Sequence, residues 1–187
     1  ISVAESTIRS DLDLTKQQTG WIMAMFSLPY ALAQIPSGGL VQRFGTRICL
    51  PLFAIAWSAA TFLLGKANGL MLLATARIGQ GISQAGIFPA STHTISQWFP
   101  ATERAFPNGA LGAFMSLGGA AGMGLAGFLV ANPDIGWRGM YFIFSVPGLL
   151  FAGLFWFWFR NQPSEHKAVN AAELTHITKE QEKTDTG

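Results

Sequence analysis

Long runs of apolar residues, separated by short polar segments, dominate this chain of 187 residues. The runs are continuous and do not alternate between apolar and polar positions, which favours membrane helices over the strands of a barrel. Five of them approach the roughly 20 residues that a helix needs to cross a bilayer. They cover residues 20–41, 48–64, 69–88, 108–130 and 140–159. The pattern therefore predicts an all-α fold, a polytopic helical bundle in contact with a lipid bilayer.

The polar segments separate this bundle from its flanks. We expect residues 20–160 to form a transmembrane bundle of five helices. Residues 1–19 are expected to hold the end of an earlier helix and an external loop, and the polar residues 161–187 a cytoplasmic loop or tail. The chain opens at Ile1 without an initiator methionine, so we expect it to be a piece of a longer protein.

Charge is scarce and unevenly placed along the chain. Only 12% of the residues are charged, and neither Asp nor Glu occurs between Leu14 and Thr102, whereas soluble domains carry roughly 25% charged residues. A small excess of Lys and Arg on the side of Arg43 and Arg47 favours the cytoplasm for that side. The formal net charge of +2 gives no basis for nucleic-acid binding.

Nothing in the sequence indicates catalysis. The histidines His93, His166 and His176 are scattered, and no acid inside a span completes a hydrolytic triad. A single cysteine, Cys49, cannot build a disulfide framework or a thiolate metal cluster. The glycine pattern at 122–127 falls inside a membrane-length run, without the preceding strand that a dinucleotide-binding motif needs. We therefore expect no enzyme, no metal and no cofactor.

One charged residue, Arg77, lies near the middle of a predicted span, about eight residues or roughly 12 Å from its start. An arginine there costs at least about 2.5 kcal/mol on insertion scales, so its side chain must face protein or water. The predicted spans contain no carboxylate that could pair with it. Arg77 is therefore an anion site, the partner of a carboxylate elsewhere, or a brace that bonds backbone carbonyls.

Polar residues at helical spacing extend this candidate site. Gly81 and Gln84 follow Arg77 at i+4 and i+7 and share its helix face, and Tyr30 and Gln34 lie one turn apart in the first span. A guanidinium can hold a carboxylate through two parallel hydrogen bonds, and amides both donate and accept. The set predicts a pocket for a carboxylate that bears hydroxyl groups. For Tyr30 and Gln34, a hydrogen bond to a neighbouring helix is an equal alternative.

Four motifs follow one another along the chain: GGLVQRFGTR at residues 38–47, RIGQG at 77–81, Phe88-Pro89 with WFPATERA at 98–105, and GWRGMYF at 136–142. Together they resemble the motifs of the major facilitator superfamily of membrane transporters. The first resembles the signature loop between the second and third helices of that family, and the second resembles the Arg-x-x-x-Gly motif of its fourth helix. Phe88-Pro89 together with residues 98–105, WFPATERA, is similar to the anion:cation symporter branch. The segment GWRGMYF, at 136–142, resembles the entry to helix six.

The resemblance implies two six-helix bundles with substrate at the midplane between them, of which this chain would supply helices two to six. Helix one, apart from its end, and the carboxy-terminal bundle would be missing partners. The implied activity is secondary transport of small organic anions such as sugar acids, by alternating access across the cell (inner) membrane, with a proton or sodium as coupling cation. Arg77 would bind the anion, with Tyr30, Gln34 and Gln84 in contact with it. The cytoplasmic gating loop would contain Gly38, Gln42, Arg43, Gly45 and Arg47.

Two positions depart from the family pattern. Gln42 stands where the loop motif has Asp, and Gln84 stands where many members of the branch have a Glu associated with proton coupling. An amide does not titrate, so proton coupling would have to use an acid elsewhere, such as one in helix one. Both departures also fit an alternative function, a non-transporting membrane sensor with the same fold.

Overall fold

The structure is a computed structural model that describes residues 2–177, so the final ten residues of the predicted tail lie outside the described part. Every regular element within that part is a helix, which confirms the all-α fold. In chain order they are η1 (Ser2–Ala4), α1 (Glu5–Asp11), α2 (Lys16–Phe44), α3 (Thr46–Gly65), α4 (Leu70–Ala85), α5 (Ile87–Trp98), η2 (Ala101–Glu103), α6 (Ala105–Ala131), α7 (Gly136–Trp158) and η3 (Pro163–Glu165). Residues 171–177 are helical as well.

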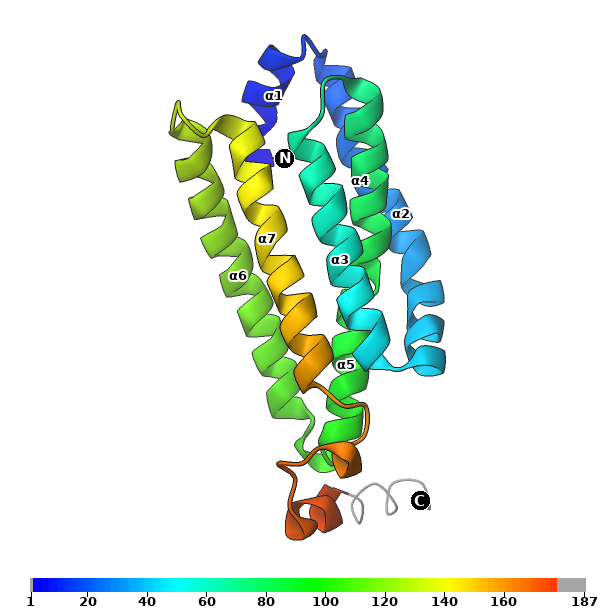
Figure 1. Ribbon diagram of the computed structural model, residues 1–187. Coiled ribbons are helices and arrows are strands. Elements are labelled where there is room, and N and C mark those ends of the chain that lie inside the picture. The colour runs from blue at the N-terminus through cyan, green and yellow to red at the C-terminus, as the bar shows by residue number, and fades with distance from the viewer. Residues whose placement is uncertain (1, 178–187) are drawn as a thin grey trace.

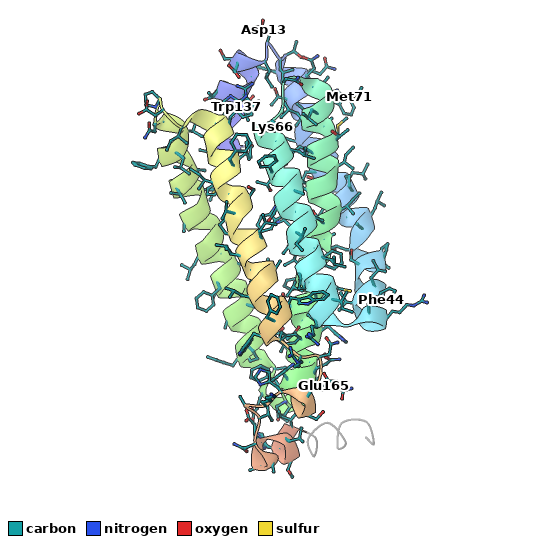
Figure 2. All side chains as sticks on the ribbon, in the orientation of Figure 1. Asp13, Phe44, Lys66, Met71, Trp137 and Glu165 are labelled. Atoms are coloured by element: carbon teal, nitrogen blue, oxygen red, sulfur yellow. The ribbon has the colours of Figure 1, made fainter. Side chains whose placement is uncertain are left out.

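The long helices run side by side along one direction (Figure 1). Helix α3 packs against α7 and α4, α4 packs against α2, and α6 packs against α7. The connections gather at two opposite ends of the bundle. Asp13, Lys66 and Trp137 lie at one of them, here named the Asp13 end, and Phe44 and Glu165 lie at the other, the Phe44 end (Figure 2).

Local sequence signals explain where α2 begins and ends. The Thr15 hydroxyl accepts a hydrogen bond from the backbone N–H of Gln18 at 3.2 Å, and the Gln18 side chain accepts one from the backbone N–H of Thr15 at 2.8 Å. This reciprocal pair satisfies two amides at the helix start. At the other end Gly45 has φ +77°, a region that favours glycine, and allows the sharp turn into α3.

The predicted span 69–88 contains helix α4 and the start of a second helix. Helix α4 ends at Ala85, and after Gly86 the chain continues as α5 to Trp98, beyond the predicted end of the span. Pro89 does not break the helix because it lies in the first turn of α5, where its missing N–H would lack a helical partner anyway. Both angles of Gly86, φ −83° and ψ −14°, are near-helical, so α5 extends α4 toward the Phe44 end.

The outer surface of the bundle is apolar. Among the described helices, α3, α6 and α7 are long and apolar enough to cross a membrane, judged by length and composition. Helix α2 has 29 residues but contains more polar positions, and α4 has 16 and reaches membrane length only together with α5. Large hydrophobic side chains such as Ile35, Phe106 and Phe157 are almost fully exposed, as expected of a surface that faces lipid.

Two clusters of buried residues hold the bundle together. The one at the Asp13 end includes Ile22, Leu64, Leu73 and Met140, from α2, α3, α4 and α7. The cluster nearer the Phe44 end is smaller and consists of Val41, Cys49, Leu50 and Ala90. A cavity lies in the middle of the bundle, lined by residues of α2 to α7.

Candidate binding site

The cavity has a volume of about 750 Å³, within the range of roughly 300–1,000 Å³ that small-molecule sites occupy. Most of its wall is apolar, with Met115, Met123 and Phe144 among the large side chains. A few polar side chains project from the helices that surround it, which is the usual composition of a pocket for a small ligand. They are Tyr30, Thr61, Gln80, Gln84, Ser91 and Tyr141.

Arg77 lies behind this wall, between α2 and α4. Its guanidinium stacks on the ring of Phe26, with the central carbon 4.6 Å from the ring centroid, and its Nη1 donates a hydrogen bond of 2.9 Å to Oε1 of Gln80. The buried Nε has no hydrogen-bond partner among residues 2–177, and no carboxylate of that range forms an ion pair with the side chain. A buried charge without a counter-charge favours an anion in its neighbourhood.

Gln80 connects Arg77 to the cavity and to α3. Its side chain is 6% exposed, lines the cavity and donates from Nε2 to the hydroxyl of Thr61 at 2.9 Å. Neither Gln80 nor Thr61 was predicted from the sequence as a site residue. The spacing of Gln80, three residues after Arg77, is a signal that could have found it, since i and i+3 side chains are neighbours on a helix.

A close approach of two helices sets this geometry. A Cβ on Gly81 would collide with the backbone carbonyl oxygen of Phe26 and would lie 3.1 Å from the backbone nitrogen of Tyr30. Glycine therefore lets α4 contact α2 almost backbone to backbone. The rings of Phe26 and Tyr30 are stacked with centroids 5.7 Å apart, so this crossing brings Arg77, Phe26 and Tyr30 together.

The structure separates the four predicted substrate contacts into three groups. Tyr30 and Gln84 line the cavity directly. Arg77 reaches it through Gln80. Gln34, one turn beyond Tyr30 on α2, is half-buried and does not belong to the cavity lining.

Tyr141 of α7 is a cavity residue that the sequence analysis did not select as a contact. It is 4% exposed, and its hydroxyl has no hydrogen-bond partner in the described part of the chain. Its ring packs edge-on against Trp137, with centroids 6.3 Å apart, and the residue forms part of the cavity lining. Leaving such a group unpaired costs about 1–3 kcal/mol, so the Tyr141 hydroxyl is a candidate for a hydrogen bond to a ligand.

The predicted gating loop lies at the Phe44 end and is tied to the end of α7. The side chain of Asn161 accepts from the backbone N–H of Arg47 at 2.9 Å and lies so close to Gly45 that a Cβ there would collide with it. Arg47 also donates from Nε to the carbonyl of Trp156 at 3.4 Å. The sequence analysis did not select Asn161, because a polar residue after an apolar run resembles the start of a tail.

The other residues of the predicted gating loop are more open. Arg43 is exposed, with its guanidinium carbon 5.4 Å from the ring centroid of Phe44, and Gln42 is exposed as well. Space is free around Gly38.

Within residues 2–177, no group of three His, Cys, Asp or Glu side chains is arranged to hold a metal ion.

Comparison with known proteins gives consistent matches over nearly the whole chain. The sequence profile of the Major Facilitator Superfamily matches residues 1–184. The probable sulfoacetate transporter SauU of Cupriavidus necator is 34% identical over 95% of this chain and 41% of its own length. The D-galactonate transporter of Escherichia coli is 31% identical over 95% of this chain and 40% of its own length. The probable L-galactonate transporter of that species is 32% identical over 95% of this chain and 38% of its own length.

Solved structures support the same fold. The inward-facing, unoccupied structure of a bacterial homologue of the human lysosomal transporter Spinster superposes with a TM-score of 0.72 at 24% identity, over 86% of this chain and 39% of that protein. This chain thus spans about two fifths of the length of the proteins that it resembles.

Proposed function

This chain belongs to the major facilitator superfamily, and from this premise we propose that it forms part of a secondary transporter of small organic anions such as sugar acids. The observation that carries the proposal is Arg77, a partly buried guanidinium with a buried Nε, which has no paired carboxylate in the described part of the chain. The names of several relatives support the choice of substrate class, since they are transporters of galactonate and sulfoacetate.

The proposed site assigns a role to each cavity residue according to its chemistry. Arg77 would neutralise the carboxylate, since its Nε has no partner within residues 2–177 and is free to donate to an anion. Tyr30 and Gln84 would bind hydroxyl groups of the substrate, because a phenol and an amide can each donate and accept. Gln34 would contact the substrate only in a conformation that opens α2 toward it.

Transport would use alternating access in the cell membrane, with the loop from Gly38 to Arg47 as part of the cytoplasmic gate. The hydrogen bonds from Arg47 to Asn161 and Trp156 support this proposal, because they join the α2–α3 turn to the end of α7. A gate of this kind opens or closes when such contacts between rigid helices exchange. Helix one and a second bundle would complete the site, and a proton or sodium ion would be the coupling cation.

Uptake by the intact protein tests the proposed function. Proteoliposomes should accumulate radiolabelled D-galactonate, glucarate, galacturonate or sulfoacetate with saturable kinetics, and neutral galactose should neither be taken up nor compete. Binding of one of these anions without uptake would support the sensor alternative instead. Absence of both binding and uptake for all four anions would contradict the proposed substrate class.

A Gln84→Glu variant is expected to add a new pH dependence to uptake, beyond any that the native protein has. Gln84 lines the cavity, and a carboxyl there would gain and lose a proton, whereas the native amide does not titrate. The measurement is the initial uptake rate against external pH at fixed membrane potential. Gln17→Glu is the matched control, since it makes the same change at an exposed position near the start of α2. Identical pH profiles for all three proteins would remove Gln84 from the site.

A further inference from the structure

A continuous chain of hydrogen bonds links Arg77 to the backbone of a neighbouring helix. The Thr61 hydroxyl donates to the carbonyl of Trp57, one turn earlier in α3, at 2.8 Å. The same hydroxyl accepts from Nε2 of Gln80 at 2.9 Å, and Oε1 of Gln80 accepts from Nη1 of Arg77 at 2.9 Å. All three side chains are wholly or partly buried, so water does not compete freely for these bonds.

The chain has only one self-consistent direction. A hydroxyl carries a single proton, and that of Thr61 is used by the Trp57 carbonyl, so its oxygen can only accept from Gln80. Gln80 must therefore direct its NH₂ group toward Thr61 and its carbonyl oxygen toward Arg77. Without the Thr61 acceptor, the amide could flip and present its NH₂ group to the guanidinium, where two donors would face each other.

Two contacts then fix the guanidinium. The ring of Phe26 lies against the guanidinium, with the central carbon 4.6 Å from the ring centroid, and the bond from Nη1 to Gln80 restrains its rotation. The edge formed by Nε and Nη2 makes no hydrogen bond within residues 2–177. This edge carries two parallel N–H groups, which match the two oxygens of a carboxylate.

We propose that Thr61 and Gln80 are positioning residues that orient Arg77, so that its Nε/Nη2 edge takes the carboxylate of the substrate. The proposal deepens the function proposed above and rests on it. Thr61 and Gln80 line the cavity, and in this proposal they act on the carboxylate by orienting Arg77. The site would accordingly prefer an anion with two coplanar oxygens over a compact anion of the same charge, because an oriented fork adds geometric selectivity to charge.

Two substitutions at Thr61 distinguish the effect of its hydroxyl group from the effect of its side-chain shape. Thr61→Val keeps the shape and removes the acceptor, and it is expected to raise the KM for D-galactonate roughly three- to tenfold, the worth of about one hydrogen bond, with little change in maximum uptake rate. Thr61→Ser keeps the hydroxyl and should restore the native KM. Thr75→Val is the matched control, because the Thr75 hydroxyl on α4 bonds only carbonyls of its own helix.

A second substitution tests whether Thr61 and Gln80 act as one unit. Gln80→Leu should raise the KM as Thr61→Val does, and the double variant should be no worse than Gln80→Leu alone, since members of one network are not additive. Additive effects, a native KM for Thr61→Val, or failure of Thr61→Ser to restore it would each overturn the proposal.

An NMR measurement tests whether Thr61 and Gln80 orient the Arg77 guanidinium, even if no anion is transported. The side-chain resonances of Arg77 in ¹⁵N-arginine-labelled protein can be assigned by their loss in Arg77→Lys. A guanidinium held at Nη1 should give separate Nη1 and Nη2 signals, and these should merge in Thr61→Val but not in Thr75→Val. Separate signals together with absent uptake would contradict the proposed function alone. Unchanged signals in Thr61→Val would overturn the positioning role.

Discussion

An Arg77→Lys variant of the intact protein is expected to have a ratio of maximum uptake rate to KM that is at least about a hundredfold lower than that of the native protein. Its level in the membrane should stay near normal. Lysine keeps the positive charge but loses the planar fork, and hydrogen bonds to charged groups contribute about 1.5–3 kcal/mol each. Arg77 contacts Phe26 and donates to Gln80 through one edge of its guanidinium, which leaves a second pair of donors for the substrate. The single ammonium group of a lysine cannot make all of these contacts at once. The measurement is the initial uptake rate of D-galactonate at several concentrations, with the membrane level determined by immunoblot.

Arg9→Lys provides the control for this substitution. Arg9 lies on α1 and pairs with Glu5 across one helical turn at 3.5 Å, a contact that lysine can also make. The pair is partly exposed to solvent, and ion pairs between neighbouring turns of a surface helix contribute little, so uptake should remain native. Near-normal uptake by Arg77→Lys would show that Arg77 braces the bundle rather than binds the anion. Loss of the variant from the membrane would support the same structural role.

Most of the architecture follows from the order of apolar runs along the chain. Continuous runs of membrane length can only be helices or parts of a barrel, and the lack of alternation favours helices. The importance of Arg77 could also be predicted from the sequence, since it is a single charge in a span without carboxylates. The residue at which α4 ends could not be predicted as well. Proline usually ends a helix, but Pro89 lies in the first turn of α5, and only the structure reveals that a new helix starts at Ile87.

The detailed site could be predicted only in part, because helix rotation decides which side chains meet. Helical spacing places Gln84 on the face of Arg77, and the cavity does contain Gln84. Spacing alone does not identify Thr61, because its contact with Gln80 depends on how α3 packs against α4. Tyr141 is similar. Tyr141 lines the cavity because of the rotation of α7, and the sequence pattern does not give that rotation.

Replacement of Gly81 with alanine is expected to destabilise the bundle and to impair uptake together. The added Cβ would collide with the backbone carbonyl oxygen of Phe26 and lie 3.1 Å from the backbone nitrogen of Tyr30, and backbone atoms cannot rotate away as a flexible side chain could. Helices α2 and α4 would have to separate, and overpacking of this kind typically costs about 1–3 kcal/mol. The same shift would move Phe26 away from the guanidinium of Arg77.

Gly79→Ala is the matched control for this last substitution, since it makes the same change two residues earlier in α4. Its Cβ would meet only the Cβ of Ala60, at an ordinary contact distance of 3.5 Å. Alanine is favoured over glycine inside a helix by about 1 kcal/mol, so Gly79→Ala should match or exceed the native protein in thermal stability. Gly81→Ala gains the same helix propensity. A net loss of thermal stability in this variant would therefore come from the close contact between α2 and α4. Equal melting temperatures for the two variants, determined in detergent, would mean that α2 and α4 do not approach as closely as the structure places them.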